Sequence, residues 1–199
     1  MASAELKQRV WTAEEFLATD QHEFGDAWRY DLVDGAIVAH AAPSPNHGAI
    51  LSGLSTAVGN RLRSRADGCR PESGSGAVPR QSQRNTARIP DAMIRCGENP
   101  RVVFEVVSPS EVRHWRTRDR RRLDLQAVAG VREIVEICQD EYAVHAYRLA
   151  ADGSWDFEAI GERDAILRLP SVGIEIPLAE ICEFATPGQE PGGEELDDA

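Results

Sequence analysis

The sequence predicts an α/β (α+β) fold in which a central mixed β-sheet is flanked by helices. Residues 88–110 read as two apolar, β-branched strands joined by turn residues at 97–100. Residues 49–65 carry leucine and valine at helical spacing, which indicates an amphipathic core helix. The strand pattern at 131–137 follows a second helical stretch, as expected where a chain returns to the same sheet after a crossover.

The N-terminal third is expected to hold a short capped helix and a β-hairpin. Thr12 is followed three residues later by Glu15, which is the spacing of a capping box. The strand-like stretches 30–33 and 36–39 flank Asp34-Gly35, a dipeptide typical of tight hairpin turns. A proline-rich loop then leads into the core helix, which Pro45 or Asn46 can begin.

The C-terminal half is expected to finish the sheet. An arginine-rich stretch leads into a helix that ends near Gly130, a residue common just after a helix. The stretch 66–88, by contrast, is polar and glycine-rich, and it predicts a loop with weak strand signals. The remaining expected elements are strands at 142–148, 155–160, 165–169 and 174–176 and a helical turn at 177–181.

Length and composition indicate one domain at residues 11–184, between a frayed N-terminus at 1–10 and an acidic, disordered tail at 185–199. The net charge of −11 does not favour a nucleic-acid-binding protein, although the positive charge is clustered. The sequence contains neither an apolar signal core nor a run of transmembrane length. We therefore expect a cytoplasmic protein.

The cysteine pattern argues against a zinc site and against a disulfide framework. No two cysteines form a CxxC pair, and all four are widely spaced in the chain. Reduced thiols in a cytosol are the simpler expectation. The four residues are Cys69, Cys96, Cys138 and Cys182.

A pair of carboxylates is the main candidate for chemistry. If residues 97–99 form a three-residue hairpin loop, Cys96 pairs with Pro100, and Asp91 then comes opposite Glu105. Directly opposed side chains have Cβ atoms about 4.5–5.5 Å apart on one face of the sheet. Two such carboxylates repel each other unless a cation lies between them, and oxygen-only ligation indicates Mg²⁺ or Mn²⁺. A register shift of one residue would instead place them on opposite faces.

These carboxylates belong to an ordered set of motifs. A Pro-Asp pair followed some fourteen residues later by an acidic residue in an apolar strand resembles the PD-(D/E)XK nuclease superfamily. The whole set is similar to the bacterial "putative restriction endonuclease" family within that superfamily, over residues 11–184. The motifs are, in chain order, WTAEEFLA, RYDLVDGAIV, SPNHGAI, PD, VVFEVVSPS, AGVREIVEI and LPSVGIEIPLAEI.

The resemblance implies a restriction-endonuclease-like fold and metal-dependent hydrolysis of phosphodiester bonds in nucleic acid, with DNA favoured and a homodimer as the active form. Asp91 and Glu105 would hold Mg²⁺ or Mn²⁺, together with the backbone carbonyl of Val106. Asp31 and His47 would line the site. The alternatives are that Asp31 is an exposed strand carboxylate and that His47 only caps or packs the helix that follows it.

One part of the family pattern is missing. The superfamily lysine would stand at Val107, whereas this family carries it on the next helix, where Arg122 aligns with it. Arg121 is the alternative if the preceding loop differs by one residue, and the one lysine in the chain is Lys7. Arginine stays charged and cannot act as a base at neutral pH, but it can hold a phosphate.

The arginine cluster is the candidate nucleic-acid contact. Arginines beside an aromatic residue are typical of phosphate-backbone binding, and Trp115 can stack on a base. The alternative is a solvated helix face that balances an acidic body. Three functions therefore remain open: a metal-dependent endonuclease, a non-catalytic module that binds nucleic acid or a protein, and a phosphoesterase. The residues proposed to contact nucleic acid are Arg113, Trp115, Arg116 and Arg118.

Overall fold

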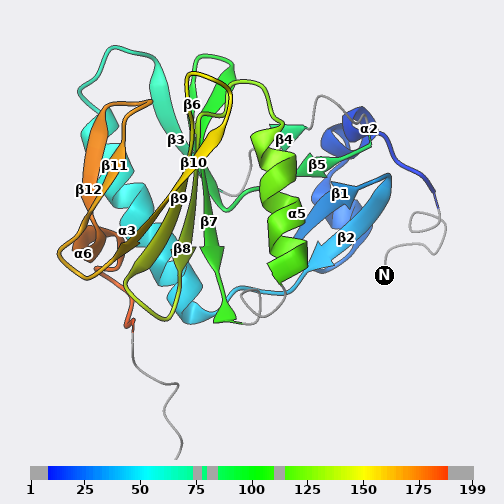
Figure 1. Ribbon diagram of the computed structural model, residues 1–199. Coiled ribbons are helices and arrows are strands. Elements are labelled where there is room, and N and C mark those ends of the chain that lie inside the picture. Colours follow the sequence, from blue (N-terminus) through cyan, green and yellow to red (C-terminus); the bar gives the residue numbers. More distant parts are fainter. Residues whose placement is uncertain (1–8, 74–77, 80–84, 110–114, 188–199) are drawn as a thin grey trace, which may run out of the picture.

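The computed structural model describes residues 9–73, 78–79, 85–109 and 115–187 (Figure 1). Its largest element is a six-stranded sheet in the order β10-β9-β8-β7-β6-β3. β7 and β8 are parallel and the other neighbours are antiparallel, which confirms the predicted mixed sheet. Its strands are β3 (Cys69–Ser73), β6 (Ala92–Cys96), β7 (Asn99–Val107), β8 (Glu133–Cys138), β9 (Ala143–Leu149) and β10 (Trp155–Gly161).

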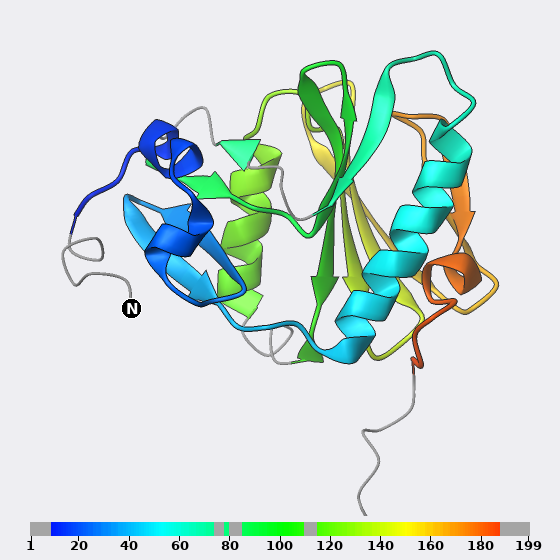
Figure 2. The same cartoon turned by 180° about the vertical axis from the view of Figure 1, so that it is seen from behind.

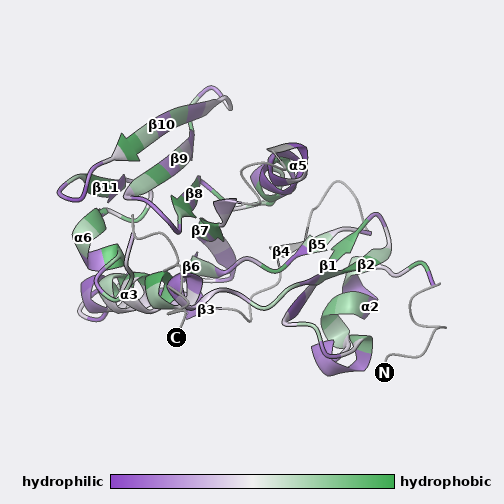
Figure 3. Cartoon of the chain, turned by 90° about the horizontal axis from the view of Figure 1, so that it is seen from below, coloured by the Kyte–Doolittle hydropathy of each residue, from purple (hydrophilic) through white to green (hydrophobic). Residues whose placement is uncertain are grey.

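Long helices cover the two faces of this sheet, as Figures 2 and 3 show. Helix α3 (Pro45–Leu62) crosses one face, and its buried residues pack with alternate residues of β7 and β8. Helix α5 (Trp115–Gln126) lies on the other face, where Leu125 contributes to a smaller apolar cluster. Because both faces are covered, β7 is buried from Val102 to Val107 and β8 is buried at every position.

A second sheet, in the order β2-β1-β5-β4, lies beside α5 (Figure 1). The predicted hairpin is confirmed, with Asp34 and Gly35 both at positive φ in its turn. Aromatic residues of α2 and η1 cover this sheet, and Thr12 and Glu15 form the predicted capping box. The elements are α2 (Ala13–Ala18), η1 (Gln21–Phe24), β1 (Arg29–Val33), β2 (Ala36–His40), β4 (Val78–Pro79) and β5 (Ala87–Arg88).

The last two strands do not finish the central sheet, so that prediction is wrong. β11 (Ile166–Leu169) and β12 (Ile174–Pro177) form a separate two-stranded sheet, followed by α6 (Leu178–Ile181). This unit packs against α3 at Gly53, where an added Cβ atom would lie 2.3 Å from the carbonyl oxygen of Ile181. The close approach therefore requires glycine at this position of the helix.

The loop of the central hairpin also differs from the prediction. Cys96 pairs with Asn99 rather than with Pro100, and the turn is Gly97-Glu98, with Gly97 at φ 59°. A register shift between Ile94 and Arg95 then compensates for the shorter loop, so that Ala92 pairs with Phe104. When this register is extended by one residue, Asp91 comes opposite Glu105, as the sequence predicts.

The expectation of four reduced thiols is wrong. Cys69 on β3 and Cys96 on β6 are directly paired across the two strands and joined by a disulfide. The sequence suggested a loop at Cys69, which hid this pairing, because cross-strand neighbours are not visible from spacing alone. Cys138 and Cys182 are buried free thiols, and burial raises the pKa of each.

We expect the double variant Cys69→Ser/Cys96→Ser to lose about 3–4 kcal/mol of the free energy of unfolding in oxidising buffer, because the bond closes a loop between cysteines 27 residues apart. Urea unfolding followed by circular dichroism measures the loss. In reducing buffer the variant and the reduced wild type should differ little. Counting four reactive thiols in unfolded, unreduced wild-type protein would contradict the assignment.

Residues 1–8 of the predicted frayed segment 1–10, residues 188–199 of the predicted tail 185–199 and part of the 66–88 loop lie outside the described residues. Within the described residues, no helix is both long and apolar enough to cross a membrane.

Candidate active site

Four polar side chains form a row across the central sheet, on the face that α5 covers. Glu105 on β7 pairs in register with Glu136 on β8, and Glu136 pairs with His145 on β9. Asp91 precedes β6 and extends the row beyond Glu105. Side chains at directly paired positions point to the same face of a sheet. The topology thus brings together residues that are up to 54 positions apart in the chain.

Asp91 is held by groups from three elements. Its Oδ2 accepts a hydrogen bond from the backbone N–H of Val106 at 2.8 Å, and its Oδ1 lies 3.5 Å from Nε2 of His47. Arg29 of β1 forms an ion pair with the same Oδ1. Burial alone would raise the pKa of Asp91, but His47 and Arg29 hold it well below its usual range. Asp91 is therefore an anion at neutral pH.

The pKa of Glu105 is shifted in the opposite direction to that of Asp91. Its Oε1 accepts a hydrogen bond from Nε of Arg121 at 2.8 Å, and the residue is 8% exposed. Burial raises the pKa of Glu105 to about 7, with Arg121 lowering it and the charge of Asp91 raising it further. The two carboxylates are thus close enough for the charge on one to oppose ionisation of the other.

The helix register decides between the two candidate arginines. Arg121 contacts Glu105 and Asp31 and donates to the carbonyl oxygen of Ile89 at 2.7 Å. Arg122, the first choice from the sequence, instead donates to the hydroxyl of Tyr147 at 3.2 Å. Neighbouring residues on a helix point about 100° apart, so only one of the two can face the carboxylate pair.

Asp31 is not an exposed strand carboxylate, so that alternative is wrong. The residue is completely buried. It accepts hydrogen bonds from the backbone N–H of Ile89 at 2.9 Å and from Arg88 at 3.1 Å, and it also pairs with Arg121. Burial would raise the pKa of Asp31, but Arg121 and His40 keep it far below its usual range. Asp31 therefore acts on the site through Arg121.

His47 lies in the first turn of α3, but its side chain does not cap the helix. Ser44 is the N-cap residue, and its Oγ accepts a hydrogen bond from the backbone N–H of His47 at 3.1 Å. The imidazole ring points instead toward Asp91. The structure therefore brings Asp91, Glu105, His47 and, through Arg121, Asp31 into one site.

The proposed nucleic-acid contacts are more dispersed. Arg118 turns toward the sheet, where its Nε donates to Oε2 of Glu136 at 2.8 Å. Arg116 is exposed on α5. Trp115 begins α5, and Arg113 lies outside the described residues. In Figure 3 helix α5 is coloured mostly as hydrophilic and lies between the two sheets.

Sequence reasoning missed Arg29, Arg88 and Glu136. A signal was present for Glu136, because it is the one charge between Ile134 and Cys138 in a fully buried strand, which is the argument that identified Glu105. No comparable signal existed for the arginines, whose partners lie on other elements.

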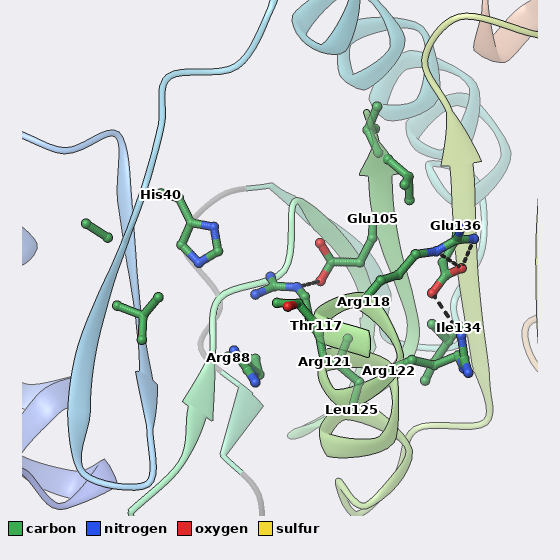
Figure 4. Close-up of a pocket in the computed structure, with 14 residues that line it drawn as sticks. His40, Arg88, Glu105, Thr117, Arg118, Arg121, Arg122, Leu125, Ile134 and Glu136 are labelled. Carbon is green, nitrogen blue, oxygen red and sulfur yellow. Dashed lines mark hydrogen bonds and ion pairs between the residues drawn. The ribbon is translucent and has the colours of Figure 1, made fainter. Parts of the chain in front are cut away.

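Two hollows that share His40 meet this group of residues, and a third, of about 720 Å³, reaches Arg29 and Asp91 from the side of η1. One, of about 430 Å³, is lined by Arg29, His40, His47 and Asp91 among others. The second, of about 360 Å³, lies on the Glu105 side, beneath α5 (Figure 4). His40 lines both. The carboxylate pair is therefore open to a ligand from more than one direction.

The donor set suits a divalent cation that needs few protein ligands. Among the described residues, no group of three or more His, Cys, Asp and Glu side chains could hold a metal ion. Mg²⁺ needs fewer protein ligands, because it is commonly bound by one or two carboxylates together with water and substrate phosphates. Asp91 and Glu105 are two neighbouring carboxylates, and the charge of Asp91 disfavours ionisation of Glu105, as expected where a cation is bound.

An acidic residue before one strand, a second carboxylate on the next strand and a cation from the following helix define the class of protein as a restriction-endonuclease-like nuclease fold. The family model described as "putative restriction endonuclease" (Uma2) matches residues 13–179. The chain belongs to this family.

Among solved structures, the fold resembles a crystal structure described as a putative nuclease belonging to DUF820 from Anabaena variabilis. The TM-score is 0.66 at 18% identity, and the match covers 87% of this chain and 98% of the other. At this identity the match shows the fold alone. No curated protein matches the chain.

Proposed function

We propose that this protein is a divalent-metal-dependent endonuclease that hydrolyses phosphodiester bonds in nucleic acid, with DNA as the favoured substrate. One observation carries the proposal. Asp91 lines one open hollow and Glu105 lines another, and the charge of Asp91 disfavours ionisation of Glu105, a penalty that a bound cation would relieve. Membership of a family described as restriction endonucleases agrees with this reaction class.

Asp91 and Glu105 would hold Mg²⁺ or Mn²⁺, and we include the backbone carbonyl of Val106 as a third protein ligand. When bound, such an ion lowers the pKa of a water molecule and stabilises charge on a phosphoryl oxygen. Arg121 and Arg29 already lie at the two carboxylates and would donate to the oxygens of the scissile phosphate. His47, at 3.5 Å from Asp91, would orient that carboxylate.

The absence of a lysine at this site lowers the rate of hydrolysis that we expect. We take Arg121 as the counterpart of the lysine that the family resemblance implies on this helix. Burial lowers the pKa of Arg121, but the charges of Asp31 and Glu105 outweigh burial and raise it. It therefore remains charged and cannot accept a proton from water. We propose slow hydrolysis, in which Arg121 binds the phosphate but performs no proton transfer.

Nicking of supercoiled plasmid in Mg²⁺ or Mn²⁺ tests this proposal. Asp91→Asn and Glu105→Gln should each abolish metal-dependent nicking, whereas the control Asp156→Asn, at an exposed position of β10, should retain it. Calorimetric titration with Mn²⁺ should give binding to wild type and none to either site variant. Nicking that persists in both site variants would contradict the assignment.

A non-catalytic module is the second candidate, and one observation favours it. Arg29 already pairs with Asp91, and Arg121 pairs with both Glu105 and Asp31, so these charges are balanced without an added ion. A wild-type protein that binds nucleic acid but neither binds Mn²⁺ nor nicks plasmid would establish this alternative.

For cleavage of both strands we propose a homodimer, as the family resemblance implies. Sedimentation of the protein with and without DNA measures this state.

A further inference from the structure

The cavity beneath α5 has apolar walls. It lies between β2, the C-terminal end of β7, β8 and α5 (Figure 4). Its volume of about 360 Å³ falls at the lower end of small-ligand sites, which span about 300–1,000 Å³. Its apolar lining residues are Val38, Ala39, Val106, Val107, Leu125 and Ile134.

Charged side chains line this cavity on both sides, with His40, Arg88, Glu105 and Arg121 on one side and Arg118, Arg122 and Glu136 at the other end (Figure 4). Glu136 is only 3% exposed, and its Oε2 accepts a hydrogen bond from Arg118. Its Oε1 lies 3.7 Å from Nη1 of Arg122, which also stacks over the ring of Tyr147. Figure 4 shows Arg118 and Arg122 reaching from the helix to Glu136, with Glu105 on the neighbouring strand. The cavity therefore offers both a carboxylate acceptor and guanidinium donors.

These surroundings restrict the ligand. A phosphate or other anion would meet Glu105 and Glu136, and the arginines that also line the cavity are already paired with carboxylates: Arg88 with Asp124, Arg118 with Glu136 and Arg121 with Glu105. A cation would meet Arg118 and Arg122, which already balance Glu136. A neutral, planar group with apolar faces and a polar edge suits both the apolar walls and the end of the cavity formed by Glu136, Arg118 and Arg122. Nucleobases have this form, and proteins read their edges with carboxylates and arginines.

We propose that the cavity receives an unstacked nucleobase that carries an amino group, with Glu136 accepting from the amino group and Arg122 donating to a ring or carbonyl acceptor. The inference rests on the proposed function, because the base would belong to a nucleotide beside the phosphate held at Asp91 and Glu105. Enzymes that act on a base within a duplex extrude the nucleotide into a pocket of this kind. Glu136 would thus set a base preference near the cut.

The test uses DNA duplexes that carry 2-aminopurine, an amino-bearing base whose emission rises when it leaves the stack. Wild type in EDTA should raise the emission several-fold for at least one position of the probe. Glu136→Gln and the pocket-filling variant Val38→Phe should bind the duplex with similar affinity by anisotropy but should lose most of that rise. Glu158→Gln, at a half-exposed glutamate on β10, is the matched control and should keep it.

Base preference gives a second readout. Sequencing of nicked ends should show a preference for one amino-bearing base in wild type, reduced about tenfold in Glu136→Gln. Val38 is 39% exposed, so Val38→Phe tests the cavity even if Glu136→Gln does not fold. Duplex binding and nicking with no emission change at any position would overturn this inference alone. Absence of duplex binding would overturn it together with the proposed function.

Discussion

Asp31→Asn is expected to lower the free energy of unfolding by about 3–5 kcal/mol, because it removes the charge that two buried arginines share. The side chains of Arg88 and Arg121 are 7% and 12% exposed, and both contact Asp31. Asparagine keeps the size of the side chain but cannot balance either guanidinium. Urea unfolding at neutral pH measures the loss.

Asp34→Asn is the matched control for this change. Asp34 lies three residues along the same hairpin, and its ion pair with Arg120 joins side chains that are 56% and 50% exposed. Exposed pairs of this kind contribute at most about 1 kcal/mol, and asparagine tolerates the positive φ of this turn position. Equal losses in the two variants would show that the buried network around Asp31 does not carry the stability assigned to it.

The pH dependence of this network follows from the lowered pKa of Asp31. A carboxyl whose folded-state pKa is depressed contributes stability above its unfolded pKa and loses that contribution as the pH falls through the folded value. The contribution of Asp31 should therefore persist well into acid, and the difference between wild type and Asp31→Asn should be nearly constant at and above neutral pH.

The sequence was sufficient to predict the carboxylate pair, because the evidence for the pairing lies in neighbouring residues of the chain. The turn at Gly97, the β-branched strands and the lone charge of Glu105 all lie within one hairpin. The predicted loop length was wrong, yet Asp91 still faces Glu105, because the irregularity between Ile94 and Arg95 restores the pairing.

What sequence reasoning missed depends on contacts between distant elements. Arg29 reaches Asp91 across 62 positions of the chain, and Cys69 pairs with Cys96 only because β3 forms the sheet edge. The choice between Arg121 and Arg122 needed the rotation of α5, which a loop of uncertain length before the helix leaves open. Periodicity predicts each element but not how the elements meet.

Glu105→Gln is expected to stabilise the metal-free protein at pH 8 while it abolishes metal-dependent nicking. The pKa of Glu105 is about 7 in the folded state and 4.5 as its ordinary value, because burial disfavours the charge. Between these values the folded state binds more protons than the unfolded state, so wild-type stability falls as the pH rises from 4.5 through 7. Glutamine carries no such penalty.

The difference between the folded-state pKa of Glu105 and its ordinary value corresponds to at most about 3 kcal/mol. This amount should appear as added stability of Glu105→Gln at pH 8 and should nearly vanish at pH 4.5. Urea unfolding in EDTA at both pH values measures it, and Glu158→Gln should show no such pH-dependent gain. Lower stability of Glu105→Gln at both pH values would mean that the ion pair with Arg121 outweighs burial. A carboxylate that costs stability in the metal-free protein is expected where it binds a cation, since active sites commonly trade stability for function.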